Sequence, residues 1–122
     1  MFHTELFVRK LSASIVFYRC LFGKPCAEYN EKRALFKNED GAALLLTDES
    51  VLGENHYFTA MADSKKGKGV ELILPVNNLE AVFNKIHRIY PENIESAIVS
   101  RPWGKVDFRV VDPDGYYVRV TS

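Results

Sequence analysis

The sequence has little cysteine, no surplus of charge of either sign and no long apolar run. A structural zinc site needs about four ligands, whereas the chain contains only two cysteines, Cys20 and Cys26, and no second pair. Sixteen basic residues balance sixteen acidic ones, so no overall electrostatic field favours nucleic acid or an anionic membrane. We therefore expect two reduced thiols, and we expect neither nucleic acid nor a membrane as a partner.

The N-terminal segment lacks the basic-then-apolar order of a signal peptide, and no apolar run approaches the length of a membrane span. We therefore expect a cytoplasmic protein. Its 122 residues are 47% hydrophobic and 26% charged, a composition typical of a globular protein. This length predicts a single domain over residues 1–122.

The apolar pattern predicts the same order of elements twice: a strand, a helix and three strands. The first set is a strand over 2–8, a helix with Ser12 as N-cap that ends at Gly23, and strands over 26–30, 33–37 and 42–47. The second set is a strand over 70–76, a helix over 77–93, and strands over 96–102, 105–111 and 116–122. Residues 48–69 are typical of a long loop, within which 56–61 suggest a short strand.

Two short matches allow the second half to be aligned with the first. The segment VRKL from Val8 aligns with VNNL from Val76, an offset of 68 (76 − 8). The turn NEDG, which ends at Gly41, aligns with DPDG, which ends at Gly115, an offset of 74 (115 − 41). A repeat of this kind predicts two similar modules, approximately 1–48 and 69–122, packed about a pseudo-twofold axis and linked by the long loop.

Alternation within the predicted strands places most polar side chains on the face opposite the helices. Val118 and Val120 suit the side that faces a helix, which leaves Tyr117 and Arg119 on the other side. The same reasoning assigns these further residues to that second face: His3, Glu5, Glu71, Asp107 and Arg109. We expect Trp103 and Tyr57 around its rim.

Three segments resemble the glyoxalase, bleomycin-resistance and extradiol-dioxygenase superfamily, also called the vicinal oxygen chelate fold. They are HTELFVRKLSASIVFYRCLFG from His3, ILPVNNLEAVFNKI from Ile73 and WGKVDFRVVDPDGYYVRV from Trp103. The resemblance implies an α+β fold of two pseudo-repeated βαβββ modules. Their mixed sheets would curve into a cup, with one helix per module covering the outer face. It also implies a homodimer.

In the metal-dependent members that the chain resembles, the ligands come from four equivalent strand positions. These fall here on His3, Leu45, Glu71 and Arg119. His3 and Glu71 can bind a divalent metal, whereas Leu45 has no donor atom and Arg119 is a permanent cation. We therefore expect no cofactor; the alternative is zinc, nickel, manganese or iron bound by His3 and Glu71.

Three functions follow from these expectations, and the sequence leaves open whether the protein is an enzyme. The first is a metal-independent binder of a small polar or anionic molecule, because the planar guanidinium of arginine suits a carboxylate or phosphonate. Its expected ligand-binding residues are His3, Glu5, Glu71, Trp103, Asp107, Arg109, Tyr117 and Arg119.

The second function is a lyase, isomerase or dioxygenase with a rearranged metal site on His3, Glu5 and Glu71. The third is a structural module whose charged face is closed by its own salt bridges. The loss of two ligand positions favours the first function over the second. The two arginines, Arg109 and Arg119, favour it over the third. The sequence identifies neither the ligand nor any catalytic residue.

Overall fold

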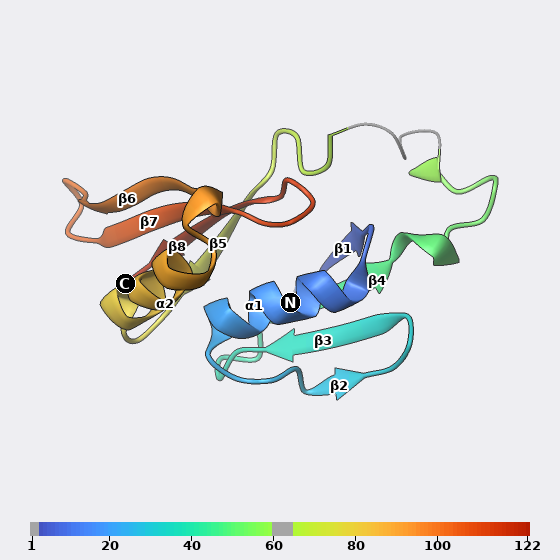
Figure 1. The fold of residues 1–122 in the computed structure, drawn as a ribbon, viewed down its shortest axis with the longest axis horizontal. Coiled ribbons are helices and arrows are strands. Elements are labelled where there is room, and N and C mark those ends of the chain that lie inside the picture. Colours follow the sequence, from blue (N-terminus) through green and yellow to red (C-terminus); the bar gives the residue numbers. More distant parts are fainter. Residues whose placement is uncertain (1–2, 60–64) are drawn as a thin grey trace. The chain divides into compact units, whose positions relative to one another are not determined.

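A computed structural model describes residues 3–59 and 65–122 of the chain (Figure 1). The chain divides into two compact units, Met1–Lys65 and Lys66–Ser122, which are called the first and second modules below. Within the described residues, neither helix is long and apolar enough to cross a membrane. Cys20 and Cys26 are free thiols, as expected.

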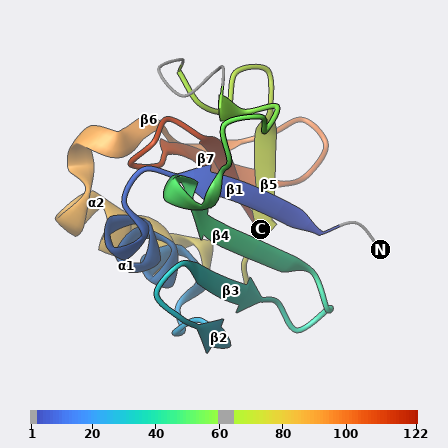
Figure 2. The same ribbon diagram turned by 90° about the vertical axis from the view of Figure 1, so that its right-hand side faces the viewer.

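The first module contains one helix and a four-stranded mixed sheet. Its elements are β1 (Thr4–Val8), α1 (Leu11–Phe22), β2 (Glu28–Tyr29), β3 (Arg33–Lys37), β4 (Ala43–Asp48) and the short 3₁₀ helix η1 (Glu49–Val51). The strand order is β1-β4-β3-β2, which Figure 2 shows from one side. The β1–β4 pair is parallel and the other two pairs are antiparallel.

The second module repeats this arrangement. Its elements are β5 (Glu71–Pro75), α2 (Leu79–Ile89), the 3₁₀ helix η3 (Pro91–Asn93), β6 (Ile94–Ser100), β7 (Val106–Val111) and β8 (Tyr117–Thr121). The strand order is β5-β8-β7-β6, with β5 and β8 parallel. The predicted α+β fold of two βαβββ modules is confirmed.

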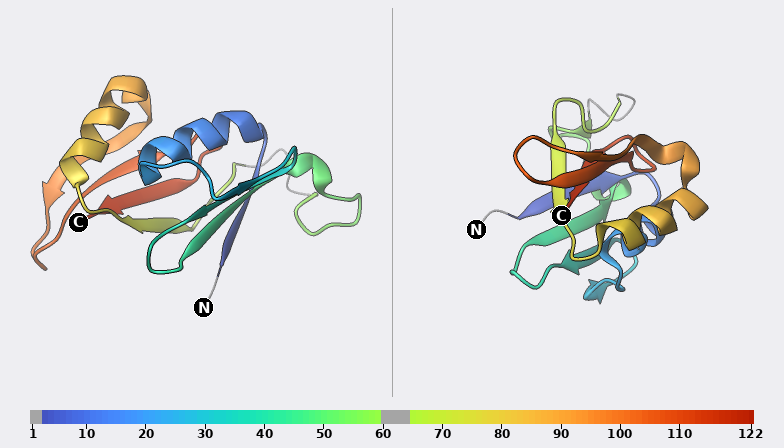
Figure 3. Two further views of the ribbon diagram at one scale, coloured as in Figure 1. Left: turned by 90° about the horizontal axis from the view of Figure 1, so that it is seen from below. Right: turned by 90° about the vertical axis from the view of Figure 1, so that its left-hand side faces the viewer.

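Each helix covers one face of its own sheet, as Figure 3 shows for α2. In the first module, Phe22 of α1 stacks on the buried Phe36 of β3 at a ring distance of 5.1 Å. In the second, Phe83 of α2 meets the buried Phe108 of β7 edge to face at 5.2 Å. Burying these apolar faces leaves the opposite face of each sheet free of its helix, and in the second module that face carries polar residues.

The first helix begins earlier than its sequence indicates. Ser12 is not the N-cap, because the helix starts at Leu11 and Lys10 is the cap residue, without a side-chain hydrogen bond. The buried side chain of Leu11 anchors this first turn instead. Gly23 ends the helix as predicted, in the left-handed conformation (φ 73°) that favours glycine.

Other element boundaries also differ from the prediction. The second helix spans Leu79–Ile89 rather than 77–93, and the 3₁₀ helix Pro91–Asn93 follows it. The second strand of the first module contains only Glu28–Tyr29, and β6 begins at Ile94 rather than at residue 96. Of the strand suggested at 56–61, residues 56–59 form turns, and 60–61 lie outside the described residues. Backbone hydrogen bonds from His56 to Gly53 and from Thr59 to His56 close these turns.

The two modules share not only topology but also strand register. Glu5 lies opposite Leu45 in the first module, and Ile73 lies opposite Arg119 in the second. These two pairs differ by the offsets that the sequence repeat gives, 68 (73 − 5) and 74 (119 − 45). The alignment therefore identifies structurally equivalent residues in the two sheets.

The DPDG segment forms the turn between β7 and β8. Oδ1 of the buried Asp112 accepts hydrogen bonds from the backbone N–H groups of Asp114, Gly115 and Tyr116, at 2.8 to 2.9 Å. Gly115 has φ 105°, a conformation that residues with a Cβ rarely adopt. This turn fixes the register that sets the side chains of β7 beside those of β8.

Candidate functional site

A cluster of charged residues lies on the face of the second sheet opposite α2. β7 and β8 place Val110 and Val118 in the core, so their alternate residues point away from it. Asp107 and Arg109 come from β7, and Arg119 comes from β8. We call Glu71, Asp107, Arg109 and Arg119, together with Arg101 of the β6–β7 loop, the charged cluster.

Both carboxylate oxygens of Asp107 accept hydrogen bonds from Arg101. Nε of Arg101 donates to Oδ2 at 3.0 Å and Nη2 donates to Oδ1 at 2.8 Å, a two-point pair of the kind that arginine forms with carboxylates. The side chain of Asp107 is only 1% exposed. Hydrogen bonding by Arg101 holds the pKa of Asp107 below its ordinary value, against the opposing effect of burial. The same bonds raise the pKa of Arg101.

Arg109 and Arg119 share a single carboxylate at longer range. They lie directly opposite each other on β7 and β8, and Nε of each is 3.6 Å from Oε1 of Glu71. Nε of Arg109 is also 4.0 Å from Oδ1 of Asp107. Both Nε atoms are buried and have no hydrogen-bond partner among the described residues. Like charges opposite each other destabilise a strand pair, so this pair of arginines requires a nearby anion.

Tyr117 extends the cluster along β8. Its hydroxyl donates to Oε2 of Glu95 at 2.6 Å. Burial raises the pKa of Tyr117, and the hydrogen bond to Glu95 raises it further, while hydrogen bonding by Arg109 acts in the opposite direction. The phenol therefore keeps its proton at neutral pH, and Glu95 is occupied by that contact.

The equivalent face of the first module has a different chemistry. Leu35 lies opposite Leu45, and this pair corresponds to Arg109 and Arg119 at the common offset of 74 (109 − 35 and 119 − 45). Glu5 accepts a hydrogen bond from Thr47 Oγ1 at 2.6 Å. His3 is exposed. The repeat therefore carries a leucine pair in one sheet and an arginine pair in the other.

The residues expected for the site fall in both modules. His3 and Glu5 belong to the first module, while Glu71, Asp107, Arg109, Tyr117 and Arg119 lie together in the second. Trp103 occupies the tip of the β6–β7 hairpin and is 61% exposed. Tyr57 is exposed in the first module, where its ring contacts that of Phe58 at 5.5 Å.

Sequence reasoning missed two members of this region, Arg101 and Glu95. Arg101 follows β6 and contacts Asp107 from a tight turn. Strand alternation does not predict on which face of the sheet a side chain in a turn lies. The hydrogen bond from its backbone N–H to the carbonyl of Lys105 pairs these two residues across the hairpin. The sequence signal was therefore a basic residue directly before Pro-Trp-Gly. This residue pairs across the hairpin with Lys105, and the acidic Asp107 follows Lys105 by two positions.

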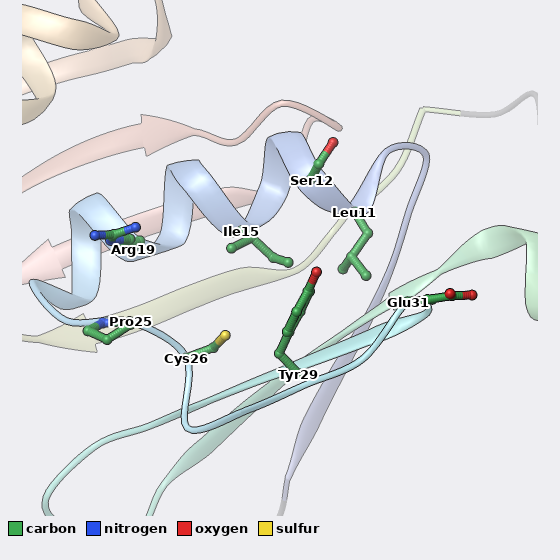
Figure 4. A pocket seen from close by; sticks show the side chains of 8 residues that line it. All are labelled: Leu11, Ser12, Ile15, Arg19, Pro25, Cys26, Tyr29 and Glu31. Carbon is green, nitrogen blue, oxygen red and sulfur yellow. The ribbon is translucent and has the colours of Figure 1, made fainter.

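The described residues also form an open groove in the first module, between α1 and the segment 25–31 (Figure 4). Its volume is about 370 Å³. Ile15 and Arg19 of α1 line one side, and Cys26 and Tyr29 line the other. None of the residues expected for the site lines this groove.

The charged cluster does not fit a divalent metal. Of the four positions that the resemblance implies, Leu45 has no donor atom. Arg119 is a permanent cation, and its Nε lies 3.6 Å from Oε1 of Glu71, another of the four positions. A metal at Glu71 would stand against the two positive charges of Arg109 and Arg119. Among the described residues, no three His, Cys, Asp or Glu side chains come close enough to hold a metal ion.

Solved structures with the same fold include proteins with different described roles. A protein of unknown function from Agrobacterium tumefaciens str. C58 is 24% identical, with a TM-score of 0.76 over 99% of this chain and 91% of that one. A glyoxalase-related enzyme from Fulvimarina pelagi is 20% identical, with a TM-score of 0.74 over 99% and 86% of the two chains. A bleomycin-binding protein complexed with bleomycin is 16% identical, with a TM-score of 0.65 over 100% and 97%.

These likenesses establish the fold alone, because fold and chemistry vary independently at such low identity. No curated protein matches the sequence. The family model, in contrast, matches nearly the whole chain, from residue 1 to residue 120. The chain therefore belongs to the Glyoxalase/Bleomycin resistance protein/Dioxygenase superfamily.

Proposed function

We propose that the protein binds a small anionic molecule, without a metal, on the face of the second sheet that carries Arg109 and Arg119. The observation that carries the proposal is the pair of buried Nε atoms without hydrogen-bond partners. A buried donor without a partner costs about 1–3 kcal/mol, which an anion that accepts from both arginines would recover.

The charges of the cluster support an anion rather than a cation. Arg101 and Asp107 neutralise each other through two short hydrogen bonds. Next to the two unpartnered Nε atoms, Glu71, Arg109 and Arg119 carry one negative and two positive charges, a local excess of one positive charge; the charge of Glu95 lies farther along β8, at the hydroxyl of Tyr117. Arginines that are 22% and 25% exposed are partly shielded from water, so this excess acts on a ligand more strongly than a surface charge would.

The two competing functions fit the contacts less well. A metal-dependent enzyme would need ligands beyond Glu71, and Glu5 is already hydrogen-bonded to Thr47. A self-paired structural face describes Arg101 and Asp107 well, but it describes Arg109 and Arg119 less well, because these two arginines share the one carboxylate of Glu71. Their distance of 3.6 Å from Glu71 is too long for a hydrogen bond.

Substitution of Arg119 by alanine tests this function. We expect acetate, benzoate or inorganic phosphate to raise the unfolding temperature of the unaltered protein in proportion to its concentration, because a ligand of the native state stabilises it. Arg119→Ala should weaken this binding about ten- to hundredfold, since charge-assisted hydrogen bonds contribute about 1.5–3 kcal/mol. The measurement is a thermal-unfolding titration at constant ionic strength.

The matched control is Arg88→Ala, which removes the same charge from an exposed position of α2. It should bind the anions like the unaltered protein. Equal weakening in both variants would mean that only overall charge matters, and no response of the unaltered protein to any of the three anions would count against the proposal.

A further inference from the structure

Within the described part of the chain, Glu71 is the one carboxylate of the charged cluster that no hydrogen bond holds in place. Its Oε1 lies 3.6 Å from Nε of both Arg109 and Arg119, and its side chain is 35% exposed. It stands at the first residue of β5, the edge strand of the sheet. Asp107, in contrast, is buried and held by two hydrogen bonds from Arg101.

From this geometry we infer that Glu71 occupies the place of the ligand's oxygen and sets the charge of the ligand that the site accepts. The inference rests on the proposed function of Arg109 and Arg119. Two donors that converge on one carboxylate oxygen define a position for a single anionic oxygen. Glu71 reaches that position only at long range, so a ligand that makes two true hydrogen bonds would displace it.

The balance of charges among Glu71, Arg109 and Arg119 then indicates the class of ligand. A ligand oxygen that displaces Glu71 from the position between the two Nε atoms still leaves its carboxylate at the edge of the site, so the local excess of one positive charge is neutralised by one negative charge. A monocarboxylate satisfies this condition. A doubly charged anion such as hydrogen phosphate would bring an additional negative charge next to Glu71, and like charges disfavour each other where water is partly excluded. The site therefore selects monocarboxylates over dianions, and Glu71 is its selectivity residue.

Substitution of Glu71 by glutamine tests this selectivity. The dissociation constants for acetate and for inorganic phosphate at pH 8 are measured by thermal-unfolding titration of the full chain. We expect Glu71→Gln to bind acetate about tenfold more tightly than the unaltered protein, and phosphate to gain more than acetate, so that the preference moves toward the dianion. Glu39→Gln, at an exposed turn, removes the same charge elsewhere and should change neither constant.

The possible results separate this inference from the proposed function. If the unaltered protein prefers acetate and Glu71→Gln moves that preference toward phosphate, the inference holds. If only Glu71→Gln binds anions, Glu71 blocks the site in the unaltered protein, and both the selectivity and the proposed binding are wrong. If the unaltered protein binds acetate but Glu71→Gln binds it no better or less well, the inference is wrong and the anion site stands. If neither protein binds either anion, the proposed function itself fails.

Discussion

Replacing Arg109 and Arg119 together with leucine is expected to abolish the response to anions and to raise the free energy of unfolding by about 1–2 kcal/mol. The first module supplies the rationale, because Leu35 and Leu45 form the equivalent cross-strand pair. The double replacement removes two buried donors without partners and the repulsion between opposite arginines. Asp107 keeps its two hydrogen bonds from Arg101.

Chemical denaturation measures the stability of this variant, and titration with acetate measures its binding. If the variant gained stability but kept its affinity for acetate, the anion would bind at a site other than the two arginines. A loss of stability would show instead that Glu71 depends on the two arginines for its own place in the fold. The single control Arg88→Leu should leave both quantities nearly unchanged.

Removal of the Asp107 carboxylate should have the largest effect on stability. Asp107→Ala leaves Arg101, Arg109 and Arg119 without their buried counter-charge, and we expect a loss of about 2–4 kcal/mol in the free energy of unfolding at pH 7. Asp107→Asn keeps the shape and one acceptor oxygen, so its loss should be smaller. Urea denaturation of the three proteins measures these differences.

The pH dependence of this loss follows from the direction of the pKa shift. The pKa of Asp107 is lower in the folded protein than in the unfolded chain, because Arg101 binds the charged form. A group of this kind contributes stability above its unfolded pKa of about 3.9, and this contribution disappears as the pH falls through the folded value. The difference between the unaltered protein and Asp107→Ala should be largest above about pH 5 and shrink below about pH 4. A difference independent of pH would contradict the ionic account.

The sequence predicted the fold well because the same information appears in it twice. The offsets of 68 and 74 hold for every strand pair that carries the site, so Leu45 and Arg119 are true structural equivalents. The repeat also contained the correct start of the first helix, since Leu11 aligns with Leu79, the first residue of α2. Capping preference pointed to Ser12 instead, and burial of Leu11 overrode it.

The charged cluster was predictable only where the strands alternate regularly. Asp107, Arg109, Tyr117 and Arg119 lie on the regular ladder of β7 and β8, and alternation assigned them to the correct face. β6 has register shifts between Ile94 and Ser96 and between Ser96 and Val99, so alternation could not place Glu95. The expected homodimer and the expected roles of His3, Glu5 and Trp103 stay predictions.

The most direct test of the account is an NMR titration that follows the side-chain Nε–Hε groups of the arginines while acetate is added to the unaltered protein. We predict that the Nε–Hε signals of Arg109 and Arg119 shift together with one dissociation constant, while the signal of Arg88 stays in place. Small shifts spread equally over all arginines, or no shift at Arg109 and Arg119 at saturating acetate, would contradict an anion site between these two residues.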